Sequence, residues 1–416
     1  MTIHIVSEAR RCLNCKKPLC QQGCPVHTPI PQIIQMFKSG QVMEAGEILF
    51  QNNPMSTICS IVCNHEQQCA GHCIRGKKDT PVHFSSIENY ISDMYLDRMK
   101  IEKPEPKDKK VAVIGSGPAG LTAAILLAQK GYPVTIFEWE DKIGGIMQYG
   151  IPEFRLPKSI LERYLSRMRE MGIQVRLNTT IGAVLQMDDL FRDGYSCVFV
   201  GTGTDRPKNL GIQGESFGNV HFGLNYLANP KRHKLGDTVA VIGMGNAAMD
   251  VARTALRNGS RHVTLYARGK HISASSSEVE YAKLDGAEFV FGKQIDHITE
   301  RGPVFKTSIF DENDRVIGYE EGLEQVEADA TIISVSQVPR KEFARNIAGL
   351  NIAGLKATEN GALLVDDTMM TTRPGVFAAG DVVTGSKTVV HAVEGAKMAV
   401  EAMTRYMEDE SSATAD

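Results

Sequence analysis

The segment Val111-Ala-Val-Ile-Gly115-Ser-Gly117-Pro118-Ala119-Gly120 decides the fold of this chain. A short apolar run typical of a buried strand leads into a glycine-rich turn, and residues 121–130 then have the composition of a helix. Glycines in such a turn let the backbone approach a pyrophosphate, to which the N-terminus of the next helix donates hydrogen bonds. The following strand ends in Glu138, about 20 residues on, where an acid usually holds ribose hydroxyls. This order predicts a dinucleotide-binding unit rather than a bare tight turn, with Gly115, Gly117, Pro118, Ala119, Gly120 and Glu138 at the cofactor.

A second unit of the same kind begins with the apolar run at 238–242. Its turn contains Gly243, Met244, Gly245, Asn246 and Ala247, and Ala248 replaces the third glycine. The strand 262–266 has no acid at its end and is followed by Arg268 and Lys270. Because an acid there would repel a 2′-phosphate and a cation would accept one, this turn favours NADPH over NADH. For Lys270 a solvated basic turn is the alternative.

Three further segments indicate how the two units are connected. The strand at 375–379 ends in Gly380-Asp381, and a helix is expected at 388–406; Asp381 is placed to bond ribityl or ribose hydroxyls. The runs 198–203 and 330–337 are predicted to be crossover strands at which the chain leaves and re-enters the first domain. We therefore expect an α/β fold in which a nicotinamide-binding domain (207–329) is inserted into a flavin-binding domain (111–206 and 330–407).

Eight of the nine cysteines lie before residue 74. They form two groups, Cys12, Cys15, Cys20 and Cys24, then Cys59, Cys63, Cys69 and Cys73. A disulfide framework is disfavoured in a chain without an export signal, and zinc remains an alternative. Two iron–sulfur clusters are favoured because eight thiolates are what two Cys₄ clusters require. The isolated Cys197 lies in an apolar run and is expected to pack as a small hydrophobe.

Composition excludes other classes of function. The 416 residues contain 46 Lys and Arg against 49 Asp and Glu, a net charge of −3, so no basic excess indicates nucleic-acid or anionic-membrane binding. The apolar runs are far shorter than the roughly 18 residues of a membrane span, and the polar N-terminus does not read as a signal peptide. We expect a cytoplasmic protein with a helical domain at 1–100, a linker at 101–110 and an acidic tail at 408–416.

Taken together, these motifs resemble the flavoprotein small subunit of glutamate synthase and its relatives, which include dihydropyrimidine dehydrogenase small subunits and ferredoxin–NADP reductase. The resemblance rests on Cys12–Pro25, Gly115–Gly120, Gly144–Arg155, Gly245–Asp250 and Ala379–Asp381. It implies FAD, two [4Fe–4S] clusters and an NADH or NADPH site.

The resemblance also implies roles for individual residues. One cluster would be held by Cys12, Cys15, Cys20 and Cys73, and the other by Cys24, Cys63, Cys69 and Glu88. Cys59 would then be a bystander, although the count of thiols alone would have used it. The residues implied at FAD are Gly145, Ile146, Arg155, Ile181, Gly380, Asp381, Lys387, Thr388 and Val389. Those implied at the nicotinamide nucleotide are Met244, Gly245, Asn246, Ala247, Arg268, Ser336 and Gln337.

The function expected from this resemblance is that of an electron-input subunit. NAD(P)H would be oxidised here, without a catalytic acid or base, and electrons would pass through FAD and the clusters to a larger catalytic subunit. The length and Cys59 favour a partner of the dihydropyrimidine dehydrogenase type, whereas Glu88 resembles glutamate synthase and the ferredoxin–NAD(P) reductases. A thioredoxin-reductase-like enzyme is disfavoured because residues 207–329 contain no cysteine. A zinc-bearing scaffold and a self-sufficient diaphorase are the remaining alternatives.

Overall fold

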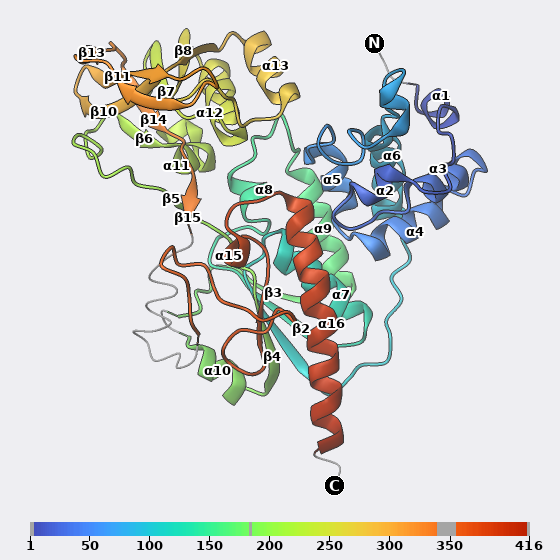
Figure 1. The fold of residues 1–416 in the computed structure, drawn as a ribbon. Coiled ribbons are helices and arrows are strands. Elements are labelled where there is room, and N and C mark those ends of the chain that lie inside the picture. The colour runs from blue at the N-terminus through green and yellow to red at the C-terminus, as the bar shows by residue number, and fades with distance from the viewer. Residues whose placement is uncertain (1–3, 183–184, 339–354, 414–416) are drawn as a thin grey trace. The chain divides into compact units, whose positions relative to one another are not determined.

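The computed structural model describes residues 4–182, 185–338 and 355–413 of the chain (Figure 1). It divides into two compact units: Met1–Gln148, Glu153–Thr204 and Pro339–Asp416 form the first, and Tyr149–Pro152 with Asp205–Val338 form the second. Residues 339–354 of the expected flavin domain and 414–416 of the expected tail lie outside the described residues. Within the described ranges, no helix is both long and apolar enough to cross a membrane.

The first unit begins with a set of helices that carries the eight clustered cysteines. Its elements are α1 (Ile5–Arg10), α2 (Leu19–Gln22), α3 (Ile30–Lys38), α4 (Val42–Asn52), α5 (Ser56–Val62), η1 (Ile74–Lys77) and α6 (Phe84–Arg98). Apolar residues at helical spacing, such as Ile30, Ile33 and Ile34 of α3, point into one core with Leu49 and Ile87. Cys69 belongs to this core, and Cys12, Cys20 and Cys73 pack at its edge.

A parallel five-stranded sheet forms the rest of the first unit. Its strands are β1 (Lys110–Ile114), β2 (Val134–Phe137), β3 (Gln174–Arg176), β4 (Tyr195–Val200) and β16 (Val376–Ala378), in the order β16-β4-β1-β2-β3. The helices are α7 (Pro118–Gln129), α8 (Ile146–Tyr149), α9 (Ser159–Glu170), α10 (Met187–Arg192), α15 (Asp381–Thr384) and α16 (Val389–Ala413). The central strand β1 is apolar throughout its buried part because both of its faces are covered. Helix α7 packs against α16 and is buried along most of its length.

Helix α9 joins the cysteine-bearing helices to this sheet. The hydroxyl of the fully buried Tyr164 donates to the carbonyl of Pro54 at 2.7 Å. Arg163 forms ion pairs with Asp93 and Asp97 of α6 at 2.6 and 2.7 Å. These contacts hold the two parts of the first unit together.

The second unit contains a parallel sheet and a smaller antiparallel one. The parallel strands are β6 (Val220–Phe222), β7 (Thr238–Ile242), β8 (His262–Ala267), β9 (Glu288–Phe291) and β14 (Ala330–Ile333), in the order β6-β14-β7-β8-β9. The antiparallel strands are β10 (Lys293–Thr299), β11 (Gly302–Phe310), β12 (Val316–Tyr319) and β13 (Glu324–Gln325), and β5 (Arg206–Pro207) pairs with β15 (Gln337–Val338). The helices are α11 (Gly223–Ala228), η2 (Pro230–Arg232), α12 (Asn246–Arg257) and α13 (Ser276–Asp285).

The predicted fold class is confirmed, but the predicted boundary at residue 330 is wrong. Strand β14 pairs with β6 and β7 of the second unit rather than with the first sheet. Its four buried apolar residues suit the interior of either parallel sheet, so local composition could not distinguish the two. The second unit therefore continues to Val338.

Candidate functional site

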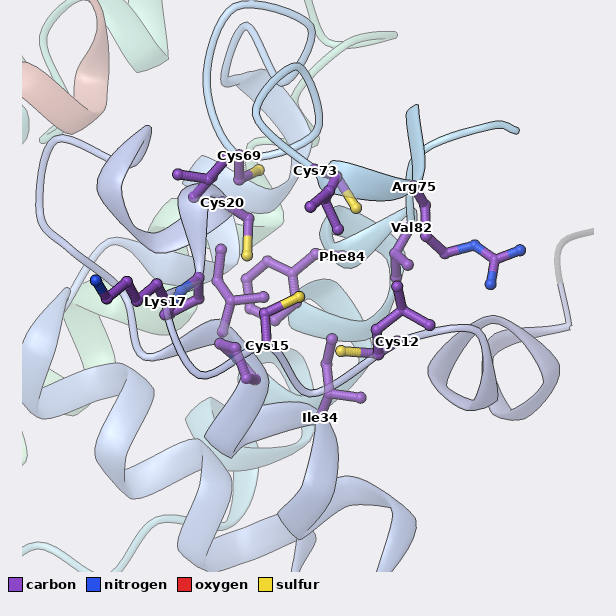
Figure 2. Close-up of a pocket in the computed structure, with 16 residues that line it drawn as sticks. Cys12, Cys15, Lys17, Cys20, Ile34, Cys69, Cys73, Arg75, Val82 and Phe84 are labelled. Atoms are coloured by element: carbon purple, nitrogen blue, oxygen red, sulfur yellow. The ribbon is translucent and has the colours of Figure 1, made fainter. Parts of the chain in front are cut away.

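Five cysteines of the helical part line one cavity, namely Cys12, Cys15, Cys20, Cys69 and Cys73. The sulfur atoms of Cys12, Cys15, Cys20 and Cys73 point into the same space (Figure 2). Burial and, after it, the neighbouring thiols Cys73, Cys12 and Cys15 raise the pKa of Cys20 to about 11. The protein alone therefore disfavours a thiolate at Cys20, and a bound cationic group would favour it. We call Cys12, Cys15, Cys20 and Cys73 the first thiol group.

A second set of side chains, three thiols and one carboxyl, adjoins the first thiol group. Burial raises the pKa of Cys69, and the nearby Glu88 and Cys24 add to this effect. Glu88 is itself buried, which raises the pKa of its carboxyl well above the usual range. The pKa of Cys63 is also raised, most strongly by its hydrogen bond with Cys59 and next by burial. We call Cys24, Cys63, Cys69 and Glu88 the second thiol group.

The donor atoms of both groups are mostly thiols, which as thiolates are the usual ligands of iron–sulfur clusters. Among the described residues, no three His, Cys, Asp or Glu side chains are grouped closely enough to hold a single metal ion. Cys59 lies beside the second thiol group, is 2% exposed and bonds to Cys63, so the arrangement leaves both Cys59 and Glu88 near the three thiols of that group.

The glycines at the junction of β1 and α7, where Gly120 already lies in the first turn of the helix, serve two different purposes. A Cβ atom on Gly115 would lie 2.7 Å from the carbonyl oxygen of Gly201, and one on Gly120 would lie 2.0 Å from that of Gly115. These two glycines are therefore required by the packing of the turn itself. A Cβ atom on Gly117 would meet nothing nearer than 3.8 Å. The open space at Gly117 is what the approach of a pyrophosphate to the backbone needs.

Glu138 lies at the end of β2 beside this turn. Its carboxylate accepts hydrogen bonds from the backbone N–H of Ser116 at 2.8 Å, from the Ser116 hydroxyl at 2.5 Å and from the N–H of Glu140 at 2.9 Å. Three donors leave part of its capacity of about four lone-pair sites for a ribose hydroxyl. Ser116, which sequence reasoning missed, also accepts from Gly144 N–H and so ties the Gly144-Gly145 turn to the same place.

The Gly380-Asp381 turn meets the start of α7. A Cβ atom on Gly380, whose φ is +79°, would lie 3.0 Å from that of Ala119. Burial raises the pKa of Asp381 to about 6, against the hydrogen bond that it accepts from the N–H of Lys387 at 3.1 Å. Thr388 bonds to the ring of His391 at 2.6 Å. Asp381 is therefore close to the cofactor-facing end of the first sheet, as expected of a residue at a parallel-sheet edge.

The other residues implied at FAD occupy varied positions. Val389 begins α16 and is buried, whereas Ile146, at the start of α8, and Arg155 are partly exposed. Ile181 is 3% exposed and packs in the core with Phe137 and Val200. Cys197 is buried in β4, and its thiol donates to the carbonyl of Gly375.

The turn between β7 and α12 repeats this construction in the second unit. Gly243 has a φ of +128°, and its Cβ atom would lie 2.3 Å from the Ser334 carbonyl oxygen. The Met244 carbonyl accepts from the N–H groups of Ser273 and Ala274. Asn246 accepts from the N–H of Ser275 at 2.9 Å. A Cβ atom on Gly245 would make only an ordinary contact at 3.6 Å, so this glycine, like Gly117, faces open space.

The two cations after β8 differ in their surroundings. Arg268 is exposed, and its carbonyl accepts from Ser308. Lys270 is paired with Asp314 at 2.5 Å and lies over the ring of Phe310, 4.7 Å from its centre. Arg268 is therefore the better placed of the two for a 2′-phosphate.

Ser336 and Gln337, the two residues implied at the nicotinamide nucleotide beyond β14, lie within the second unit. The carbonyl of Ser336 accepts from the N–H of Lys208 at 3.1 Å. Gln337 pairs with Pro207 between β15 and β5. Ser336 has a φ of +153°, which is uncommon for a residue other than glycine.

Sequence reasoning also missed a hydrogen-bonded chain that ends at the second thiol group. Lys397 of α16 donates to Asn52 at 2.8 Å, Asn52 donates to the hydroxyl of Thr28 at 3.4 Å, and that hydroxyl is 3.4 Å from the Cys24 sulfur. No motif contains these residues, because they come from three distant parts of the chain. Ser116, by contrast, stands inside the glycine motif and could have been found there.

Comparisons with known proteins agree with this geometry. Residues 109–396 match the pyridine nucleotide-disulphide oxidoreductase family, and residues 2–100 match dihydropyrimidine dehydrogenase domain II, 4Fe-4S cluster. The glutamate synthase [NADPH] small chain of Halomonas elongata is 34% identical, over 97% of this chain and 90% of that protein. The NAD-dependent dihydropyrimidine dehydrogenase subunit PreT homolog of Salmonella typhi is 31% identical, over 97% and 94%.

A solved structure shows the same fold. FprA from Mycobacterium tuberculosis in complex with NADPH superposes with a TM-score of 0.61 at 17% identity, covering 74% of this chain and 86% of that one. The family matches account for both nucleotide-binding turns and for the cysteine-bearing helices. This chain therefore belongs to the pyridine nucleotide-disulphide oxidoreductases that carry an N-terminal 4Fe-4S domain, and it is an NAD(P)H-dependent FAD and iron–sulfur oxidoreductase.

Proposed function

We propose that this chain is the electron-input subunit of a heteromeric oxidoreductase and that it works in the cytoplasm. The observation that carries the proposal is the union, in one chain, of two nucleotide-binding turns and two thiol groups. A nicotinamide donor delivers electrons in pairs, whereas iron–sulfur clusters carry them singly, and a bound flavin supplies the conversion between the two. All nine cysteines, each of which lies in the described part of the chain, are thiols rather than disulfides, and this suits a reducing compartment.

The chain's own residues bind and orient in this proposal. The turn at Gly117 and the start of α7 hold the FAD pyrophosphate, Glu138 holds a ribose hydroxyl, and Asp381 bonds the sugar-alcohol part. The turn at Gly245 holds the nicotinamide nucleotide in the same way. The first and second thiol groups hold one cluster each, with Glu88 as the non-cysteine ligand and Cys59 outside the coordination shell. No side chain is assigned as acid or base, because direct hydride transfer requires none.

NADPH is the proposed donor. The end of β8 carries no acid, and the exposed Arg268 supplies a guanidinium that can bond a phosphate through two parallel N–H groups. Lys270 contributes less because Asp314 neutralises it.

The proposed partner is a larger catalytic subunit that reduces a pyrimidine. The buried Cys59 and the length of 416 residues support this assignment, and the chain spans 94% of the PreT homolog. A glutamate synthase large subunit is the second candidate. The buried Glu88 beside Cys24 and Cys69 favours it, as does the 34% identity to a glutamate synthase small chain.

The test is an anaerobic titration of the purified, cluster-loaded protein with NADPH and with NADH. The flavin absorbance should bleach with at least one nucleotide, and reduced-cluster signals should then appear in the electron paramagnetic resonance spectrum. A flavin band that neither nucleotide bleaches would end the proposal. Purification from the native host under mild salt then identifies the larger subunit: uracil-dependent or glutamine-dependent oxidation of the nucleotide by the complex decides between the two partners.

A further inference from the structure

Large apolar side chains are exposed around the first thiol group. Leu13, Leu19 and Ile74 are 61, 39 and 44% exposed. All three line the same cavity as Cys12 and Cys15, so they stand close together rather than scattered over the surface. Single exposed apolar residues are ordinary, but neighbouring ones at the mouth of a functional cavity indicate a surface that another molecule covers.

The same surface is rich in positive charge. Residues 10–20 contain four Lys and Arg and no acid, and residues 71–79 contain three against one, although the whole chain has a net charge of −3. The one acid, Asp79, is already bound by Arg11 and Arg75 at 3.2 and 2.8 Å. The lysines have no such neutralising partner in these two segments. We define the docking surface as Leu13, Lys16, Lys17, Leu19, Ile74, Lys77 and Lys78, all of which are exposed.

An electron leaves a protein where its last redox centre comes close to the surface. All four thiols of the first group are partly exposed, whereas two of the four members of the second group, Cys69 and Glu88, are buried. Short-lived redox complexes use small interfaces, in which opposite charges steer the encounter and set the orientation. An apolar centre with a rim of lysines has the composition of such an interface.

We propose that an electron-accepting protein with an acidic surface beside its own redox centre binds at the docking surface. This inference rests on the proposed function, because it needs a reduced cluster at the first thiol group. Each NAD(P)H is oxidised to NAD(P)⁺ with release of one proton and two electrons. Two successive one-electron transfers across the docking surface discharge them, and no bond forms between the proteins.

The experiment uses the holoenzyme and a small acidic [2Fe–2S] ferredoxin as the probe. The variants Lys16→Glu/Lys17→Glu and Lys77→Glu/Lys78→Glu reverse two charges each within the docking surface. Lys103→Glu/Lys130→Glu is the matched control, with the same change of net charge at exposed positions outside it. At low salt, each docking-surface variant should reduce the ferredoxin about tenfold more slowly or worse, and the control should match the wild type. High salt should slow the wild type towards the variants.

Two internal measurements separate the possible failures. The rate of anaerobic flavin reduction by NADPH should be equal in all four proteins, since none of these lysines belongs to a nucleotide-binding turn. Because Lys17 lines the cavity of the first thiol group, iron content is measured in each protein and the ferredoxin-reduction rates are compared per bound iron. If the wild-type flavin is not reduced, the proposed function itself fails. If flavin and clusters are reduced normally but the ferredoxin is not, or if both docking-surface variants reduce it as fast as the control, the docking proposal is overturned.

Discussion

Two glycines three residues apart in the first turn should respond to the same substitution in opposite ways. Gly117→Ala adds a methyl group that meets no protein atom within 3.8 Å, at a φ of −67° that alanine adopts freely. Gly120→Ala adds the same group 2.0 Å from the Gly115 carbonyl oxygen, a backbone atom that cannot move without moving β1 or α7. The first change perturbs only an approaching ligand, and the second perturbs the folded protein itself.

The magnitudes follow from the cost of forcing a methyl group into packed surroundings, about 1–3 kcal/mol. For Gly120→Ala this amount is lost from the free energy of unfolding of the flavin-free protein. For Gly117→Ala it is lost from FAD binding, which corresponds to an increase of about 5- to 150-fold in the dissociation constant. The stability of flavin-free Gly117→Ala should stay within about 0.5 kcal/mol of the wild type.

The assay removes FAD from each variant, measures denaturant unfolding of the flavin-free protein, and then titrates FAD back while following its fluorescence. Gly245→Ala is the parallel case in the second unit, where the KM for the nicotinamide nucleotide replaces the FAD affinity. A Gly117→Ala protein that binds FAD as tightly as the wild type would refute the placement of the pyrophosphate at this turn. A Gly120→Ala protein of normal stability would refute the steric reasoning.

Four further predictions concern single side chains. Arg268→Ala should raise the KM for NADPH about tenfold or more, because a charge-assisted contact is lost, and leave that for NADH unchanged; equal changes in flavin-reduction kinetics would place Arg268 away from the phosphate. Burial raises the pKa of Asp381 to about 6, so this carboxyl stays protonated in the folded protein at pH values where it is already ionised in the unfolded chain. The stability of the wild type therefore falls as the pH rises from about 4 to about 6. Asp381→Asn should therefore stabilise the flavin-free protein above pH 6, by at most about 3 kcal/mol, with no gain below pH 4 in thermal unfolding. Glu88→Ala should halve the iron content whereas Cys59→Ala preserves it, and the reverse result would exchange their roles. Lys397→Met should lower the reduction potential of the cluster at Cys24 in a spectroscopic redox titration, because a nearby cation favours the reduced cluster; an unchanged potential would show that the chain through Asn52 is only structural.

The parts of the fold that sequence predicts well are those fixed by local sterics. Both glycine turns follow short buried strands as expected. Gly115 and Gly243 adopt positive φ values, which a sequence reader can anticipate because only glycine does so freely. The thiol groups were also suggested by spacing, although their division into two sets came from resemblance and not from the count of cysteines.

Non-local pairing is what the sequence did not reveal. The composition of β14 suits either parallel sheet, and the residues Ala330–Ile333 do not by themselves indicate that its pairing partners are β6 and β7. The antiparallel strands β10 to β13 were not anticipated, since their register depends on partners rather than on a motif. For the same reason the ion pair between Lys270 and Asp314, which changes the expected role of that lysine, became visible only in the structure.

Helix α16 is the element that ties the flavin side of the first unit to its thiol groups. A Cβ atom on Gly395 would lie 3.2 Å from that of Ala379, directly before the Gly380-Asp381 turn. Two residues later Lys397 begins the hydrogen-bonded chain to Cys24. The second thiol group therefore shares a helix with the proposed FAD site, and Cys69 in turn adjoins Cys20 of the first group.

From this sequence of contacts we propose that the two clusters have different tasks. The second thiol group is the more enclosed and the nearer to α16, so its cluster is suited to receive electrons from the flavin side. The first thiol group is bordered by Leu13, Leu19 and Ile74 at the surface, so its cluster is suited to deliver them. A chain that only reduced small dyes would need no second cluster and no lysine-rimmed apolar surface beyond it, and for this reason we favour a protein as the electron acceptor over a self-sufficient diaphorase.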